Sequence, residues 1–249
     1  MNNIIDLKST IGEIVKDNYR TAEVFKKYNI DFCCGGNKTI SEVCNDKNLN
    51  VVELSKELEK KIFQSVESLQ NYKDWEIGFL TDYIINIHHK YVKENIPILT
   101  EFTNKIAKVH GDSHPELFKI EEYFNDASEE LQHHLMKEER ILFPYIFSLS
   151  NAQKNNTKID PSPFGTVRNP ISMMIMEHEN AGNLLKKIRA ITNNYELPED
   201  ACNTYNITFK KLDEFENDLH LHIHLENNIL FPKAIFLEEN LVGNLSRIY

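Results

Sequence analysis

The sequence predicts an all-α protein, in which an antiparallel four-helix bundle over residues 75–240 follows a small helical domain over residues 1–65. Apolar residues recur at helical spacing through most of the chain, and the alternation typical of strands is nearly absent. Two long helical stretches repeat one another at an offset of 88 residues. A polar segment with three prolines, residues 151–170, separates the two copies and reads as a surface crossover between two halves of a bundle.

Composition limits the classes of partner and the compartment. Hydrophobic residues make up 41% of the chain and charged residues 27%, as in ordinary globular proteins. The net charge of −10 argues against a nucleic-acid partner, which favours a basic surface. Because no apolar stretch is long enough to cross a membrane and no signal peptide is evident, we expect no membrane partner and a cytoplasmic location. In that compartment the four cysteines are expected to be thiols.

Short helices account for the first 65 residues. Three are expected: one over 7–28, one that begins at Thr39 and one over 51–69, with a linker near 66–74. Thr39 followed by Glu42 resembles a capping box, in which each side chain bonds the other residue's backbone. Two glycines in the loop Asp31–Gly36 permit backbone angles that other residues resist.

Four long amphipathic stretches follow. They cover about 75–109, 114–150, 170–194 and 199–238. The second contains LQHHLMKEERILFP and the fourth LHLHIHLENNILFP, which share a leucine, a histidine, a glutamate and the run Ile-Leu-Phe-Pro. The proline that ends each run is expected to disrupt or end its helix.

The repeat selects six residues as metal ligands. They are His89, His134, Glu138, His178, His222 and Glu226. In each half the histidine and the glutamate of the repeat lie four residues apart, so both project from one face, which also carries leucine and isoleucine. Two hairpins with equal spacing can pack about a pseudo-twofold axis and bring the six side chains together.

Imidazoles and carboxylates form a nitrogen and oxygen donor set that suits iron or manganese better than a thiophilic metal. Two bridging glutamates and two histidines per ion leave each ion an open position for dioxygen, nitric oxide or peroxide. A single histidine on an apolar face is more often a core residue, and a single His-x-x-x-Glu is often a surface pair. Duplication of both features favours a site for two metal ions.

Several neighbouring residues are less certain members of the site. His89 is preferred to the adjacent His88 because its spacing matches the second half of the repeat. Glu130 and Glu177 lie near the expected ligands and are candidate outer partners, proton carriers or alternate ligands, although surface charge explains them equally well.

Three interpretations of the vicinal cysteines Cys33 and Cys34 are possible. They are a redox pair, a soft-ligand contact for iron transfer or for a partner's cluster, or small packing residues. Adjacent cysteines seldom form a relaxed disulfide. Cys44 and Cys202 are isolated, and packing is favoured for both.

The motifs of the chain resemble those of a known family, the repair-of-iron-centres proteins. The N-terminal segment Asp31–Gly36, with the preceding Phe-Lys-Lys-Tyr, is similar to the small first domain of that family. The segments HHKYVKENIP, HHLMKEERILFP, MEHENAGNLL and HIHLENNILFP are similar to its hemerythrin-like domain. The resemblance extends from about residue 5 to residue 237.

The resemblance implies that the six residues bind two iron ions joined by oxo and carboxylate bridges. It implies a role in restoring iron–sulfur clusters damaged by nitrosative or oxidative stress, by supplying iron to the damaged proteins, and it suggests a homodimer. Reduction of nitric oxide to nitrous oxide, and reversible binding of nitric oxide or dioxygen as a sensor or carrier, require the same open centre. The sequence leaves these functions, and whether the protein is an enzyme, open.

Overall fold

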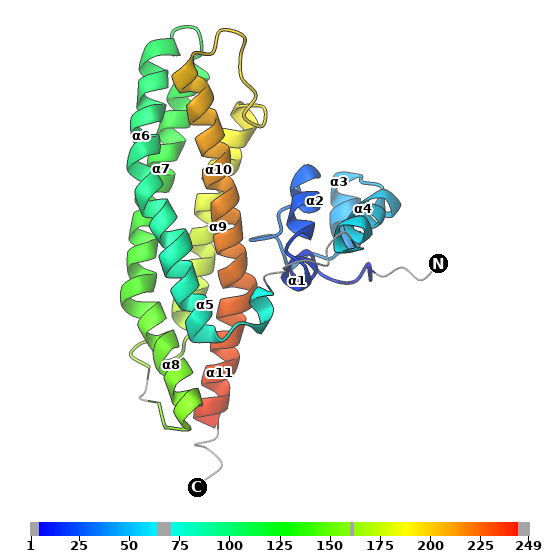
Figure 1. Cartoon of the computed structure of the whole chain (residues 1–249), viewed down its shortest axis with the longest axis vertical. Helices are drawn as coiled ribbons and strands as arrows, with labels where there is room; N and C mark the ends of the chain where they lie inside the picture. The colour runs from blue at the N-terminus through cyan, green and yellow to red at the C-terminus, as the bar shows by residue number, and fades with distance from the viewer. Residues whose placement is uncertain (1–4, 64–70, 160–161, 244–249) are drawn as a thin grey trace.

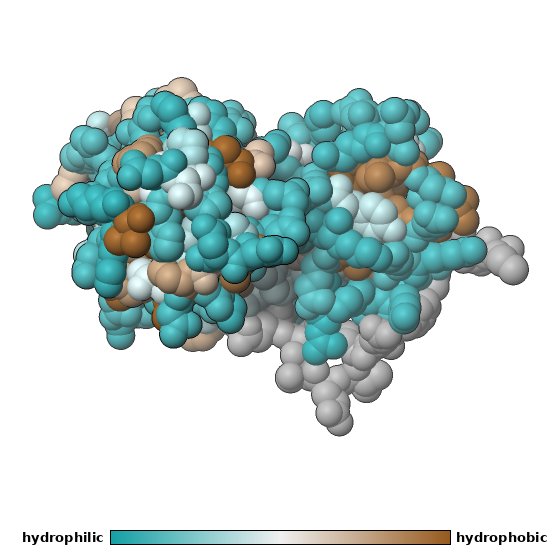
Figure 2. Space-filling model, turned by 90° about the horizontal axis from the view of Figure 1, so that it is seen from above, coloured by the Kyte–Doolittle hydropathy of each residue, from teal (hydrophilic) through white to brown (hydrophobic). Residues whose placement is uncertain are grey.

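The computed structural model describes residues 5–63, 71–159 and 162–243, and within these ranges every regular element is a helix. The helices form a long bundle with a small domain beside its middle (Figure 1). The predicted all-α class is therefore confirmed. Seen from above, the two parts lie side by side and their visible surface is mostly hydrophilic (Figure 2). No helix among the described residues is long and apolar enough to span a membrane.

Four short helices build the N-terminal domain. They are α1 (Ile11–Asp17), α2 (Thr21–Lys27), α3 (Ile40–Lys47) and α4 (Val51–Phe63). The prediction of one helix over 7–28 is wrong, because the backbone of Asn18 is extended and its carbonyl accepts a 2.6 Å bond from the Thr21 hydroxyl. The helical spacing of apolar residues continues across this break, so the sequence pattern does not reveal the break.

Two capping boxes stabilise the N-terminal ends of α1 and α3. The predicted box of Thr39 and Glu42 is confirmed, and Thr10 forms a second one with Glu13. An antiparallel bridge joins Thr10 to Thr39, so the two helix starts lie side by side. The end of the helix predicted over 51–69, and most of the linker near 66–74, fall outside the described residues.

Four antiparallel rods build the bundle, and successive rods run in opposite directions (Figure 1). The short turn η1 (Tyr72–Asp74) lies beside the N-terminal domain and precedes the first rod (Figure 1). The first rod is α5 (Ile77–Tyr83), η2 (Ile84–His89) and α6 (Lys90–His110); the second is α7 (Glu116–Lys137), η3 (Glu138–Leu142) and α8 (Phe143–Asn155); the third is α9 (Arg168–Ile191); the fourth is α10 (Asn203–Leu225), η4 (Glu226–Leu230) and α11 (Phe231–Gly243). These rods coincide with the four predicted stretches.

Three of the rods contain a π-helical turn, η2, η3 and η4. In η3 the N–H of Phe143 donates to the carbonyl of Glu138, five residues back, and in η4 Phe231 donates to Glu226 in the same way. Each phenylalanine is followed by the proline of the repeat, which has no N–H to donate. The prolines therefore disrupt their helices without ending them. Such π turns often occur at functional sites.

The core consists of two apolar clusters. One contains Leu135 and Ile223 and continues into the N-terminal domain, and the other contains Phe143 and Phe231. The repeated histidine and glutamate lie between Leu131 of the first cluster and Phe143 of the second in the second rod, and between Leu219 and Phe231 in the fourth. A polar layer thus crosses the bundle between two hydrophobic cores, and it needs its own source of stabilisation.

Candidate metal centre

The six side chains selected by the repeat converge in this layer. His89 ends η2, His134 and His222 lie near the ends of α7 and α10, Glu138 and Glu226 begin η3 and η4, and His178 lies in α9. None is more than 2% exposed. All four rods therefore contribute to one enclosed site.

The six residues form two overlapping groups, each with candidate ligand atoms within 4.8 Å of one another. His89 and His222 form one group with the two glutamates, and His134 and His178 form the other with the same two glutamates. Glu138 Oε2 lies 3.3 Å from Nε2 of both His89 and His134. Each group pairs one histidine from each half of the repeat, as a pseudo-twofold arrangement requires.

Buried polar atoms without partners indicate that the layer suits cations. Among the described residues, neither carboxylate oxygen of Glu138 forms a hydrogen bond, and the same holds for Glu226 Oε2 and His89 Nε2, so that only histidine–glutamate ion pairs offset their burial. Glu138 and Glu226 are completely buried. An uncompensated buried carboxylate costs several kcal/mol, whereas a shared pair of divalent cations satisfies both glutamates at once. The donor set of four imidazoles and two carboxylates fits a hemerythrin-type di-metal site.

Carboxylates orient one histidine of each group from outside. His89 Nδ1 lies 2.8 Å from Glu139 Oε1, and Lys93 in turn contacts this carboxylate. His134 Nδ1 lies 3.0 Å from Glu177 Oε2, and Lys137 pairs with Glu177. Such contacts fix the ring orientation and leave Nε2 free to face a metal.

The remaining outer positions differ between the groups. His178 Nδ1 contacts the Asn227 side-chain oxygen at 2.9 Å, whereas His222 Nδ1 has no hydrogen-bond partner among the described residues. Glu130, the other carboxylate singled out in the sequence, is exposed, and among the described residues it forms no hydrogen bond or ion pair with any of the six. It lines a cavity of about 810 Å³ that Glu177 also lines.

Burial and the neighbouring carboxylates shift the pKa values of the histidines in opposite directions. Burial disfavours protonation of His134, but Glu138 and Glu177 outweigh it and raise its pKa to about 10. The pKa of His89 is also raised well above its usual range, against burial, by Glu138 and Glu139. Burial dominates at His222 and lowers its pKa. Protons thus occupy positions that cations displace when they bind.

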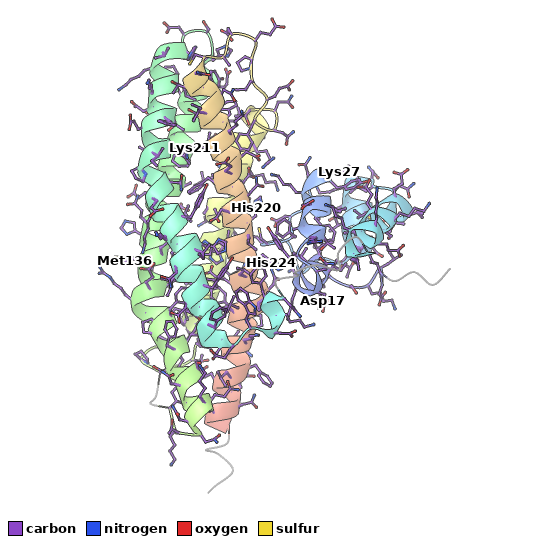
Figure 3. All side chains as sticks on the ribbon, in the orientation of Figure 1. Asp17, Lys27, Met136, Lys211, His220 and His224 are labelled. Atoms are coloured by element: carbon purple, nitrogen blue, oxygen red, sulfur yellow. The ribbon has the colours of Figure 1, made fainter. Side chains whose placement is uncertain are left out.

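Histidines beside the ligands have other contacts. His88 Nδ1 lies 2.9 Å from Asp218 Oδ1, so His89 and not His88 joins the converging group. His220 and His224 lie on the side of α10 that faces the N-terminal domain (Figure 3). Phe32 packs edge-on against both rings, with centroid distances of 5.9 and 6.0 Å.

The cysteines are all free, as expected. Cys33 is buried and Cys34 half-buried, and their sulfurs lie 3.9 Å apart. Cys44 is buried, in agreement with a packing role. The packing expectation for Cys202 is wrong, because this residue is exposed and its sulfur lies 3.1 Å from His110 Nε2.

The fold and the geometry of the site together define a hemerythrin-like protein with a di-metal site and an N-terminal dithiol domain. Family comparisons agree: residues 81–234 match the hemerythrin HHE cation-binding domain, and residues 7–62 match ScdA_N, a domain of unknown function. The chain belongs to the repair-of-iron-centres family of iron–sulfur cluster repair proteins.

Relatives in several bacteria resemble the chain over almost its whole length. The iron–sulfur cluster repair protein ScdA of Staphylococcus epidermidis is 32% identical over 233 residues, which cover 93% of this chain and 100% of the relative. The iron–sulfur cluster repair protein YtfE of Pectobacterium atrosepticum is 36% identical over 229 residues, covering 91% and 96%. YtfE of Escherichia coli is 36% identical over 228 residues, covering 90% and 96%.

Proposed function

We propose that this protein stores two iron ions in the bundle and supplies iron to iron–sulfur proteins whose clusters have been damaged by nitrosative or oxidative stress. The relatives named above are iron–sulfur cluster repair proteins. In this proposal His89 and His222 hold one ion, His134 and His178 hold the other, and Glu138 and Glu226 bridge the two. When bound, the iron pair supplies redox chemistry and open coordination positions.

The observation that carries the proposal is the pair of overlapping groups that share both glutamates. Two shared carboxylates hold two cations close together, and the open positions left by four protein donors per ion admit an oxo bridge or a diatomic ligand. Iron also suits this mixture of nitrogen and oxygen donors.

We infer that iron leaves on the side of His134. The cavity of about 810 Å³ reaches the Glu177 carboxylate, which contacts His134. Its lining also contains the carboxylates of Asp126, Glu129 and Glu130 and two lysines, Lys137 and Lys187. Because carboxylates outnumber lysines in this opening, it attracts a departing cation, whereas the apolar clusters on both sides of the layer disfavour it.

The experiment follows isotopically labelled iron. The loaded protein is mixed with a dehydratase whose cluster has been nitrosylated or stripped, and recovery of activity is measured with the label in the recipient. We expect labelled iron in the restored cluster, and loss of restoration with Glu138→Ala. Glu101→Ala is the matched control, because Glu101 is an exposed carboxylate on α6 away from the site. Restoration that is unchanged by Glu138→Ala contradicts the proposal.

Gas analysis separates iron donation from nitric oxide reduction. If the reduced protein converts nitric oxide to nitrous oxide over many turnovers and transfers no labelled iron, the site is a reductase. Reversible spectral changes without product or iron loss identify a sensor or carrier.

The cytoplasm, a reducing compartment, suits the four free thiols. The homodimer and the identity of the client proteins stay predictions from the family resemblance.

A further inference from the structure

The loop between α2 and α3 carries a second cluster of metal-ligand atoms. We propose that Asp31, Cys33 and Cys34 bind a single thiophilic divalent cation, at a site separate from the pair of ions in the bundle. Candidate donor atoms of these three residues lie within 4.8 Å of one another. The proposal rests on this loop alone and does not depend on the function of the bundle.

The spacing of the two sulfurs fits one ion. Cys33 Sγ lies 3.9 Å from Cys34 Sγ. A tetrahedral ion with bonds of about 2.3 Å to each sulfur separates them by about 3.8 Å. A disulfide between adjacent cysteines is unfavourable, because their separation is poor for standard geometry. Joint coordination of a cation therefore requires less rearrangement than formation of a bond between the sulfurs.

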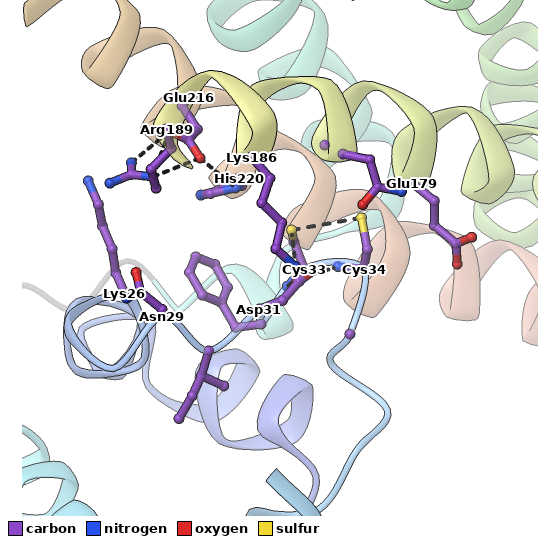
Figure 4. A pocket seen from close by; sticks show the side chains of 15 residues that line it. Lys26, Asn29, Asp31, Cys33, Cys34, Glu179, Lys186, Arg189, Glu216 and His220 are labelled. Carbon is purple, nitrogen blue, oxygen red and sulfur yellow. Dashed lines mark hydrogen bonds and ion pairs between the residues drawn. The ribbon is translucent and has the colours of Figure 1, made fainter. Parts of the chain in front are cut away.

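The loop is held in this form by its own hydrogen bonds. Asp31 Oδ1 accepts the backbone N–H groups of Cys33 and Cys34, each at 3.0 Å. Both sulfurs consequently project the same way, toward α9 and α10 (Figure 4). Phe32, 6% exposed, anchors the loop between His220 and His224. The donors are thus organised before an ion arrives, which lowers the cost of binding.

The third donor is the Asp31 carboxylate. Cys33 Sγ donates its proton to Asp31 Oδ1 at 3.2 Å, and coordination replaces this contact. Both thiols lose their protons to solvent as the two metal–sulfur bonds form. Two thiolates, one carboxylate and a divalent cation leave a net charge of −1. Lys186, which extends from α9 toward the loop, compensates this charge (Figure 4).

Three protein donors leave one position of a tetrahedral ion open. The loop borders a cavity of about 300 Å³, whose wall includes Glu179 and His220 from the bundle. Both cysteines border this cavity, and Cys34 is half-buried whereas Cys33 is buried. The open position is therefore reachable by water, and an ion held there is exchangeable, as at metal sites with three protein ligands.

Cobalt is the probe for this site. Reduced full-length protein, already loaded with iron, is titrated with Co²⁺ without oxygen, and the thiolate-to-cobalt charge-transfer absorption is recorded. We expect one tetrahedral Co²⁺ per chain, and loss of the band in Cys33→Ser and in Cys34→Ser. Asp31→Asn keeps an acceptor for the backbone amides but loses the carboxylate, so we expect the band to persist with affinity weakened at least about tenfold.

Two other free cysteines provide controls. Cys44→Ser and Cys202→Ser are expected to keep the full cobalt signal. Absence of the band in the wild type overturns the proposal, as does a band that survives Cys34→Ser and disappears in Cys202→Ser, which assigns cobalt to the Cys202 and His110 pair. If Cys33→Ser does not fold, the Cys34→Ser variant, at a half-buried position, decides the question. The iron content of the bundle, measured on the same samples, separates failure here from failure of the di-iron centre.

Discussion

Glu177 gives the sharpest test of how the bundle would hold the two proposed metal ions. Its carboxylate oxygen lies 3.0 Å from His134 Nδ1, and its side chain is 19% exposed. Loss of such an outer partner typically weakens metal affinity by about 10–100-fold, which corresponds to about 1.4–2.7 kcal/mol. Because His134 belongs to only one of the two ligand groups, Glu177→Ala is expected to loosen one ion and leave the other nearly unchanged.

A matched variant addresses the other ion. Glu139 contacts His89, which belongs to the opposite group. Glu139→Ala is therefore expected to weaken the ion that Glu177→Ala spares. Glu177→Gln keeps an oxygen that can accept from His134, so we expect a smaller loss than with alanine.

Competition with a chelator measures both affinities, and Mössbauer spectra of partly stripped protein show which iron remains. Glu130→Ala is the control, because Glu130 lines the same cavity as Glu177 but is exposed and, among the described residues, forms no hydrogen bond or ion pair with a candidate ligand. If Glu177→Ala and Glu130→Ala lose iron alike, the hydrogen bond to His134 does not orient a ligand and the reasoning is refuted.

Three further predictions concern the charge of the centre, the docking of the N-terminal domain and a helix cap. Neighbouring carboxylates raise the pKa of His134 to about 10, so a cation must displace its proton at neutral pH. Metal affinity should therefore rise about tenfold per pH unit around neutrality for this proton, and proton release during metal loading measures the effect. Phe32→Ala should lower stability by about 3 kcal/mol and speed amide exchange in the cysteine loop, whereas Phe236→Ala, at a side chain 68% exposed, should change neither. Glu76 caps α5 and, despite burial, hydrogen bonds from Ser150 and from backbone amides lower its pKa from 4.5 to about 2. Glu76→Ala should cost about 1 kcal/mol above pH 4.5 by thermal unfolding, and this difference should vanish as the pH falls through 2.

The convergence of the six candidate ligands could be predicted from the sequence because their signal is local and duplicated. A histidine and a glutamate four residues apart on an apolar face need a buried partner, and two copies at equal spacing identify one common site. Glu139 could not be found in this way. It directly follows Glu138, and adjacent residues diverge by about 100° around a helix, so only the packing of the first rod against the second shows that it meets His89.

The π turns were also beyond prediction. The sequence around Glu138 is compatible with a continuous α-helix up to the proline, and the extra residue in the turn becomes evident only from the bond of Phe143 to Glu138. The break at Asn18 had a weak signal, because asparagine after aspartate favours turns, but the apolar spacing continued across it. Local chemistry thus predicted the centre better than the path of the backbone around it.

Helix α10 links the two sites that the sequence suggested independently. His220 and His224 are four residues apart and share one side of the helix, where Phe32 packs against both. His222 lies between them and points to the opposite side, into the bundle. A helix with its side chains is only about 10 Å across, so the loop with the two cysteines is separated from a candidate ligand by a single backbone. The His-x-His-x-His pattern is explained by this placement, because its alternate histidines serve two different surfaces, one toward the metal centre and one toward the dithiol loop.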